Sequence, residues 1–202
     1  MARDVRQSKP ARRSAIRRAD LDTVDFAEPA RNRRHVIVAF ALADSHHERL
    51  VDSLAEVKGN RVGTIASGGA PLPNDRGGLV FTMDSTGAVG DEQPNLIANN
   101  AIAGIWFDDS EAAVRNNRII DNQVGVLFTG FEVNGQQLGE NNCIVGNGAG
   151  VVVGGETLGF VRADGNWWGD PSGPGGAGPG IGDSINEDVL VEEWLTLRPP
   201  GC

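Results

Sequence analysis

The middle of the chain repeats one pattern of asparagine, apolar residues and glycine. Three segments align, each running from a first Asn to a second Asn and then from a Gly into apolar residues: 95–107, 117–128 and 142–153. A partial copy leads from Asn74 to Phe81. The first Asn recurs at 95, 117, 142 and 166, in steps of 22, 25 and 24 residues. This spacing accommodates three short strands and three turns, but it is too short for a helix–turn–helix repeat.

Side chains at alternate positions of each repeat are expected to share one face of a strand. If each repeat is one coil, stacked about 4.8 Å from the next, equivalent residues form columns. The positions expected to face inward are Leu79, Ile105, Val126 and Val151, then Phe81, Phe107, Phe128 and Val153, and on a second sheet Ile97, Ile119 and Ile144. The pattern predicts an all-β fold, a parallel β-helix of about four coils over residues 59–166. Leucine-rich repeats overlap this length, but their Leu pattern is absent.

Two further columns consist of asparagine. They are Asn95, Asn117, Asn142 and Asn166, and Asn100, Asn122 and Asn147. Asn tolerates left-handed backbone angles at turns, and its amide can donate to and accept from the Asn of the next coil. These columns therefore predict structural ladders, with sugar ligation as the alternative.

The ending of the repeat region carries a more specific motif. Residues 166–174 read Asn-Trp-Trp-Gly-Asp-Pro-Ser-Gly-Pro, followed by Gly-Ile-Gly-Asp at 180–183 and an apolar stretch at 189–195. Together with the coils, this resembles the parallel β-helix repeats of the pectin-lyase-like superfamily and the terminal motif of many exported bacterial members. The resemblance covers about residues 74–195 and implies a right-handed β-helix.

Both ends of a β-helix expose apolar core and strand edges, so both need caps. At the C-terminal end, a Trp- and Gly-rich cap and tail over residues 167–202 is expected, with these side chains as the plug: Trp167, Trp168, Trp194 and Leu195. Asp170 and Asp183 would serve turn hydrogen bonding, with calcium binding as the alternative. At the N-terminal end, residues 44–58 predict an amphipathic capping helix.

Residues 1–43 are expected to be a basic extension. Residues 1–34 hold ten Lys and Arg against five Asp and Glu, whereas the other 168 residues hold eight against 22. The acidic remainder argues against binding of nucleic acid, and no apolar run reaches the length of a membrane span. A basic stretch before an apolar run, with Ala-Leu-Ala at 41–43, predicts an export signal cleaved before Asp44, and a buried strand is the alternative. The two cysteines, Cys143 and Cys202, fit either a disulfide or two free thiols.

Candidate chemistry lies after the inward phenylalanines. The resemblance implies that a lyase of this kind would bind calcium through carboxylates and use a basic residue to abstract a proton. The candidate calcium ligands are Asp84, Asp108, Asp109 and Glu132, the acidic Glu111 occupies a comparable loop, and the candidate bases are Arg115 and Arg118. The Gly-His-Gly and Arg-x-Lys signatures of pectin hydrolases are absent.

An outward apolar stripe needs an explanation as well. It consists of Val80, Trp106, Leu127 and Val152, and the expected cover is a loop over residues 129–141. Trp106 alternatively stacks on a sugar ring. The sequence favours a non-catalytic exported or cell-surface module associated with carbohydrate, without a required cofactor. The alternatives are a calcium-assisted polysaccharide lyase and a structural fragment without activity.

Overall fold

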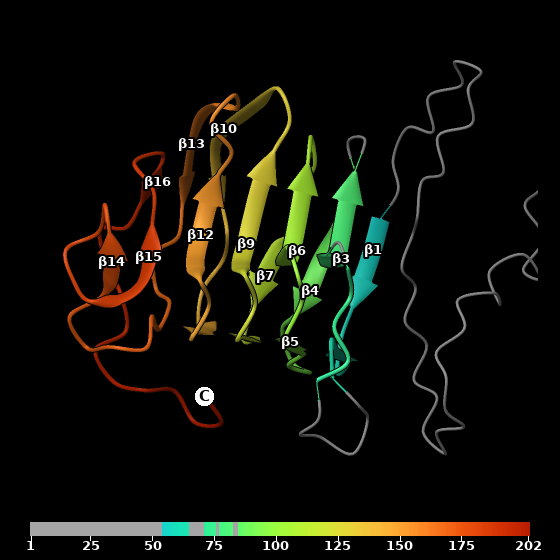
Figure 1. Ribbon diagram of the computed structural model, residues 1–202, viewed down its shortest axis with the longest axis horizontal. Coiled ribbons are helices and arrows are strands. Elements are labelled where there is room, and N and C mark those ends of the chain that lie inside the picture. The colour runs from blue at the N-terminus through green and yellow to red at the C-terminus, as the bar shows by residue number, and fades with distance from the viewer. Residues whose placement is uncertain (1–53, 65–70, 76, 83–84) are drawn as a thin grey trace, which may run out of the picture. The chain divides into compact units, whose positions relative to one another are not determined.

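The structure is a computed structural model that describes residues 54–64, 71–75, 77–82 and 85–202. The predicted basic extension, its cleavage site and Asp84 lie outside these residues. The described part is a parallel β-solenoid of about four coils, as predicted (Figure 1). Every pairing between its named strands is parallel. The described residues form strands and turns, without a helix.

Within the described residues, sixteen strands build four sheets. The six-stranded sheet has the order β14-β15-β12-β9-β6-β3, with β3 Gly77–Thr82, β6 Ala103–Asp108, β9 Val124–Thr129, β12 Ala149–Val153, β14 Pro174–Gly176 and β15 Gly182–Ile185. The four-stranded sheet has the order β11-β8-β5-β2, with β2 Arg61–Val62, β5 Leu96–Ala98, β8 Arg118–Ile120 and β11 Cys143–Val145. The first three-stranded sheet contains β1 Leu54–Val57, β4 Thr86–Gly90 and β7 Ala113–Arg115. The second contains β10 Glu132–Gln137, β13 Leu158–Arg162 and β16 Val189–Leu190.

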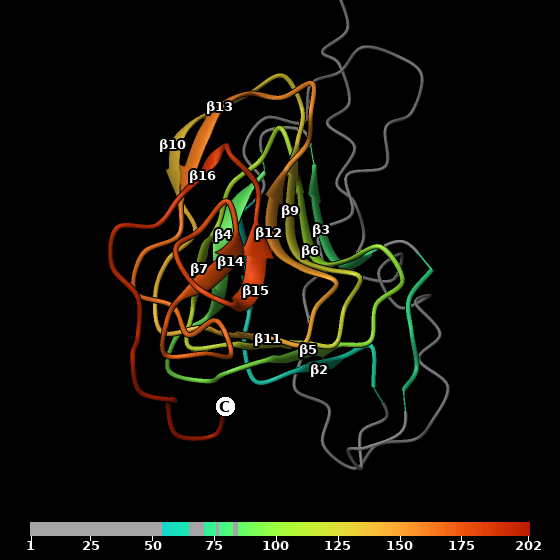
Figure 2. The same cartoon turned by 60° about the vertical axis from the view of Figure 1, so that its left-hand side comes forward.

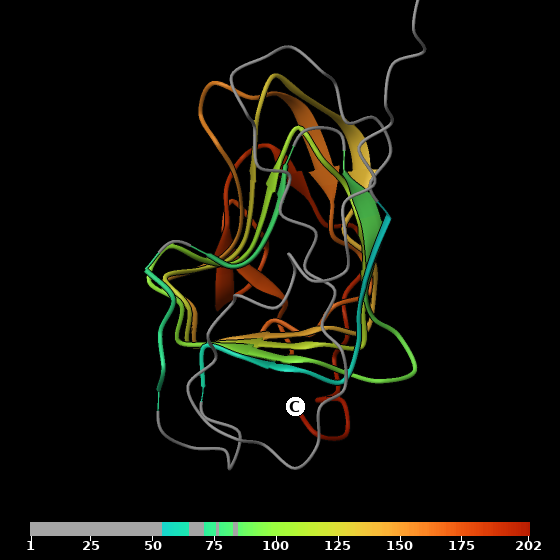
Figure 3. The same ribbon diagram turned by 90° about the vertical axis from the view of Figure 1, so that its right-hand side faces the viewer.

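The sheets form the walls around a single apolar core. Figure 2 shows β11, β5 and β2 below and β10, β13 and β16 above, with β12, β9, β6 and β3 between them. Figure 3 looks along the stack, where strands of successive coils superimpose. This superposition follows from a repeat whose apolar positions recur at equivalent places in every coil.

The predicted inward register is confirmed. Ile105 pairs with Val126 and Phe107 pairs with Phe128, so equivalent side chains stand above one another. All the positions expected to face inward are buried, as are Val114 and Val133 from the other two sheets. Phe107 lies between Phe81 and Phe128, with ring centroids 5.1 and 5.0 Å apart. The three rings form a stack along the core.

Hydrogen bonds link the asparagines of successive coils. The side-chain oxygen of Asn117 accepts from both the backbone N–H and the amide nitrogen of Asn95, at 3.1 and 2.8 Å. The same arrangement continues through Asn142 to Asn166. Each Asn side-chain oxygen accepts from the Asn of the preceding coil, so all hydrogen bonds of the ladder point the same way along the stack. The first pair of the ladder, Asn60 and Asn95, was not predicted from the sequence.

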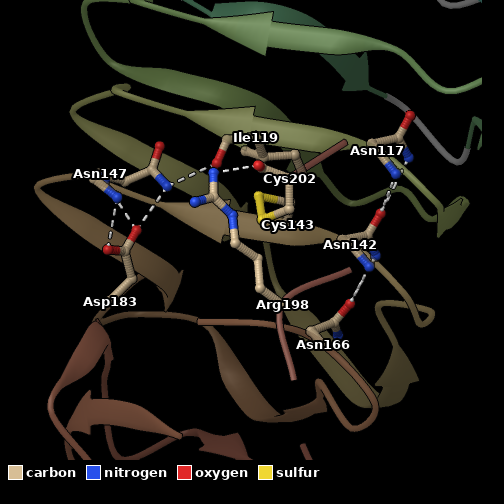
Figure 4. The surroundings of a disulfide bond; sticks show 10 residues. Asn117, Ile119, Asn142, Cys143, Asn147, Asn166, Asp183, Arg198 and Cys202 are labelled. Atoms are coloured by element: carbon tan, nitrogen blue, oxygen red, sulfur yellow. Dashed lines mark hydrogen bonds between the residues drawn. A yellow bond between two sulfur atoms is a disulfide. The ribbon is translucent and has the colours of Figure 1, made fainter. Parts of the chain in front are cut away.

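The second ladder runs through Asn100, Asn122 and Asn147 and ends on a carboxylate. Asp183 accepts from the backbone nitrogen and the side-chain amide of Asn147, at 2.9 and 2.7 Å, and from the backbone nitrogen of Gly146 at 2.9 Å (Figure 4). A carboxylate suits this position because the last Asn offers donors and an ionised Asp only accepts. Asp170 instead accepts from the backbone N–H and hydroxyl of Ser172, as expected for a turn.

The residues expected to form the C-terminal plug adjoin the last coil. Trp168 is fully buried and belongs to the apolar core, and Trp167 forms a parallel bridge with Cys143. Trp194 packs against that core, forms a bridge with Asn166 and donates its indole N–H to Pro171. Leu195 is half-buried.

Two segments differ from the expectations. Residues 54–57 of the expected capping helix form strand β1, paired with β4, and residues 44–53 lie outside the described part. The segment 129–141, expected as a loop over the outward stripe, contains β10 and is part of a wall. Val133 and Leu138 of this segment face the core. Burying these two side chains requires a wall strand, so the segment does not fold back over the stripe.

Candidate functional site

The adjacent carboxylates Asp108 and Asp109 have different partners. Asp108 ends β6 and accepts from the hydroxyl of Thr129 at 3.0 Å. Asp109 follows with a positive φ of 46° and accepts from the backbone nitrogen of Phe131 at 2.6 Å. The strand thus directs one carboxylate to the six-stranded sheet, and the turn directs the other toward β10.

A small polar hollow lies where this turn meets β10. Its volume is about 270 Å³, and we call it the acidic hollow; it is lined by Ser85, Asp109, Ser110, Glu111, Glu132 and Gln136. Two of the four predicted calcium ligands, Asp109 and Glu132, therefore meet at one place, and Glu111 joins them. Asp108 is not part of the lining. Over the described residues, no three Asp, Glu, His or Cys side chains are arranged to hold a metal ion.

Hydrogen bonds between neutral polar groups connect several of the residues that line the acidic hollow. The hydroxyl of Ser110 accepts from the backbone nitrogen of Ser85 at 3.1 Å and donates to the carbonyl of Asp108 at 3.1 Å. The amide of Gln136 donates to the carbonyl of Ser110 at 3.2 Å. A β-bulge at Gly135, with a φ of 69°, lies directly before Gln136. Bulges change the direction of the following side chain, and this one accompanies a Gln that turns toward the hollow.

The two arginines proposed as bases lie on other walls. Arg115 ends β7 in the first three-stranded sheet and is exposed, and Arg118 begins β8 in the four-stranded sheet. Neither lines the acidic hollow. Arg118 is paired in register with Cys143, and its Nε is buried without a hydrogen-bond partner among the described residues. The structure therefore does not bring the proposed bases to the proposed calcium ligands.

Aromatic and aliphatic side chains are exposed directly before β10 and in β13, around the residue whose backbone binds Asp109. Phe131 is 74% exposed, and its backbone nitrogen binds Asp109 of the hollow. Leu158, 59% exposed, donates its backbone N–H to the carbonyl of Phe131, and the ring of Phe160 lies against Gly135. Sequence reasoning missed Phe131 because residues 129–141 were expected to be a covering loop, and it made no prediction for Leu158 and Phe160. The alternation of Leu158, Phe160 and Arg162 was the available signal.

Trp106 has a different environment from these exposed residues. It lies in β6 next to Val80 and Leu127 of the outward stripe, and all three are half-buried. Its indole N–H donates to the hydroxyl of Thr129 at 2.7 Å. This bond holds the ring within the wall, so Phe131 presents much more free aromatic surface.

The two cysteines are joined in a disulfide. Cys143 and Cys202 are 59 residues apart in sequence, with Cα atoms 5.4 Å apart (Figure 4). Cys143 is the first residue of β11 and is 3% exposed, whereas Cys202 is half-buried. Of the two possibilities that the sequence left open, the structure shows the disulfide.

Comparison with protein families identifies the chain. Residues 55–164, more than half of its length, match the family described as "Right handed beta helix region". The chain belongs to this family. The match gives the solenoid its right hand and covers the coils, and it ends just before the Trp-Trp motif. Neither curated proteins nor solved structures gave a match to this right-handed β-helix chain.

Within the described residues, no helix has the length and apolar character needed to cross a membrane. The family match specifies the fold of the coils, so the functional proposal rests on the surface of these coils.

Proposed function

We propose that this right-handed β-helix chain is a non-catalytic module of an exported or cell-surface protein and that it binds carbohydrate. The observation that carries the proposal is the exposed side chain of Phe131, whose backbone nitrogen binds Asp109 of the acidic hollow. A sugar ring has an apolar face and a polar rim of hydroxyl groups. An exposed aromatic side chain near several carboxylates and an amide offers complementary contacts to both.

The charge of the site favours one class of sugar. Asp109, Glu111 and Glu132 line the acidic hollow, and no Lys, Arg or His is among its described lining residues. Carboxylates accept hydrogen bonds from hydroxyl and ammonium groups and repel other carboxylates. We therefore expect neutral sugars and amino sugars to bind better than uronic acids.

The disulfide supports the proposal of export. Disulfides persist in oxidising compartments, whereas cytosolic thiols are usually kept reduced. The sequence also has a basic stretch and an apolar run that end at Ala43, although these residues lie outside the described part. Both observations point toward an extracytoplasmic location.

A calcium-assisted lyase is the second candidate, favoured by the three carboxylates around one hollow. Such an enzyme must hold a substrate carboxylate through the cation while a base removes a nearby proton. Arg115 and Arg118 lie on two other sheets, away from Asp109 and Glu132. The arrangement supports binding better than proton abstraction.

Binding is tested by calorimetry on the oxidised full-length protein with soluble neutral, amino and uronic oligosaccharides. Phe131→Ala should weaken binding about tenfold, the equivalent of the roughly 1–1.5 kcal/mol of one aromatic contact. Ile181→Ala is the matched control, because Ile181 is also highly exposed but lies before β15, away from the acidic hollow. Unchanged affinity in Phe131→Ala, or the absence of binding to every sugar class at millimolar concentration, would contradict the proposal.

The same samples test the lyase. Calcium binding that is lost in Asp109→Asn, together with unsaturated products that disappear in Arg115→Ala or Arg118→Ala, would establish catalysis instead.

Export is tested by intact mass and peptide mapping of protein recovered from a native-like host. The expected exported form begins at Asp44 and contains the Cys143–Cys202 disulfide. Exported protein that retains Met1 would refute cleavage at this site, and recovery only from the cytoplasm would refute export.

A further inference from the structure

Residues 196–202, which we call the tail, are joined to the coils mainly through the disulfide. The last backbone hydrogen bond to the coils is from Leu195 to the carbonyl of Asn166, at 3.0 Å. The hydrogen bonds described beyond it stay within the tail: Cys202 donates to Pro199 at 3.1 Å, and the Arg198 guanidinium donates to the carbonyl of Cys202. In the described structure, no hydrogen bond or ion pair connects these seven residues to the coils.

The two cysteine residues of the disulfide differ in their exposure. Ile144 faces the core, so the neighbouring Cys143 faces outward on β11, and yet Cys143 is only 3% exposed. Cys202, at the end of the tail, is half-buried and joins Cys143 from outside β11 (Figure 4). A dissolved thiol can therefore reach Cys202 more easily than Cys143.

A basic residue, Arg118, occupies the position next to Cys143 on the neighbouring strand. Arg118 is its register neighbour on β8, on the same outward face, and neighbouring strands are about 4.8 Å apart. The Nε of Arg118 is buried and lacks a hydrogen-bond partner among the described residues. A positive charge next to a cysteine stabilises its thiolate, and a more stable thiolate leaves a disulfide faster.

We infer that the Cys143–Cys202 disulfide is a clasp that dissolved thiols open from the Cys202 side. An external thiolate attacks Sγ of Cys202 and forms a mixed disulfide there. The electron pair of the broken S–S bond goes to Sγ of Cys143, which leaves as a thiolate beside Arg118. A second external thiolate then releases Cys202 and yields the external disulfide. The tail, freed of its one covalent link to β11, separates from this wall while the coils stay folded.

The attack site is tested on the full-length protein with reduced glutathione as the probe. Samples are quenched at short times with N-ethylmaleimide and mapped by mass spectrometry. The chain has only these two cysteines, so the assignment is unambiguous. Glutathione should appear on Cys202 and maleimide on Cys143. Glutathione mainly on Cys143 would overturn the inference.

The role of Arg118 is tested by substitution. Arg118→Gln should slow exchange by about threefold for each unit by which the Cys143 thiol pKa rises. Arg118→Lys should keep most of the rate, and Arg115→Gln is the control on another sheet. In a Cys202→Ser background, the pH profile of alkylation measures the Cys143 thiol directly. Its pKa should rise when Arg118 becomes Gln, and an unchanged profile would remove Arg118 from the mechanism.

Hydrogen exchange separates opening of the clasp from unfolding. After reduction, protection should fall in the tail and in β11 but stay unchanged in β6 and β9. Loss of protection in all four together, or exchange that proceeds only at the global unfolding rate, would overturn the inference. Carbohydrate binding is measured independently on the oxidised protein, so either proposal can fail alone.

Discussion

The phenylalanine stack provides the most direct test of the coil register. Phe107→Ala removes a ring that is 1% exposed and lies between two others, with centroid distances of 5.1 and 5.0 Å. A buried Phe→Ala change costs about 3–5 kcal/mol. Each stacked pair adds about 0.5–1.5 kcal/mol beyond buried area. Because Phe107 loses two such pairs, we expect a loss near the upper end, about 5 kcal/mol.

Urea unfolding of the oxidised protein measures this loss, followed by tryptophan fluorescence and far-UV circular dichroism. The two signals must coincide before a single free energy is assigned, since solenoids can unfold in parts. Phe128→Ala loses one stacked pair and should cost about 3–4 kcal/mol. Phe131→Ala is the control, because its ring is 74% exposed, and it should change stability by at most about 0.5 kcal/mol.

Losses below about 1 kcal/mol for both Phe107→Ala and Phe128→Ala would refute the reasoning. A strand has a side-chain period of two, so an error of one residue would exchange every inward position for an outward one.

Two other predictions concern the glycine at which two coils approach closely and the Asp183 carboxyl that ends the second asparagine ladder. A Cβ on Gly104 would lie 2.8 Å from the carbonyl oxygen of Gly125, so Gly104→Ala should cost at least about 2 kcal/mol in the same urea assay. Gly155→Ala, where a Cβ meets nothing within 4 Å, should be nearly neutral, and equal losses would contradict the close approach of the coils. Burial raises the pKa of Asp183, although hydrogen bonds from Asn147 and its neighbour oppose this effect. The pKa of Asp183 is therefore higher in the folded protein than in the unfolded chain. The carboxyl contributes its full share to the free energy of unfolding at a pH below its ordinary pKa, and this share is lost as the pH rises through the folded pKa. The stability of wild type minus that of Asp183→Asn should therefore fall with rising pH in the acidic range, and a difference that grows would refute the assignment.

The sequence determined the coils because their pattern is local and repeated. Ile97, Ile119 and Ile144 recur at nearly equal spacing, so one strand assignment predicts the core position of all three. The asparagines follow the same rule, and the structure joins them with hydrogen bonds between coils. In a parallel stack, equal residues at equal positions meet each other, so periodicity alone contains this information.

The secondary structure at the N-terminal edge of the solenoid could not be predicted from the repeat. Leu54 and Val57 are three residues apart, which fits one face of a helix, and the segment is too short for periodicity to exclude a strand. Pairing with β4 decides in favour of β1, and this partner lies about thirty residues away. The segment 129–141 contains β10 for a similar reason. Val133 and Leu138 can be buried in the core only when this segment forms part of a wall of the solenoid.

The candidate site depended even more on the tertiary structure. Asp108 and Asp109 are neighbours in sequence but bind different partners. Asp108 is the last residue of its strand and binds Thr129, whereas Asp109 has a positive φ and binds the backbone of Phe131. Glu132 meets Asp109 because β10 begins beside the preceding turn, and Cys202 meets Cys143 across 59 residues. The repeat predicts which residues stack from coil to coil. Loop lengths between strands, and the path of the chain after the last coil, decide which unlike side chains meet, and these depend on long-range packing.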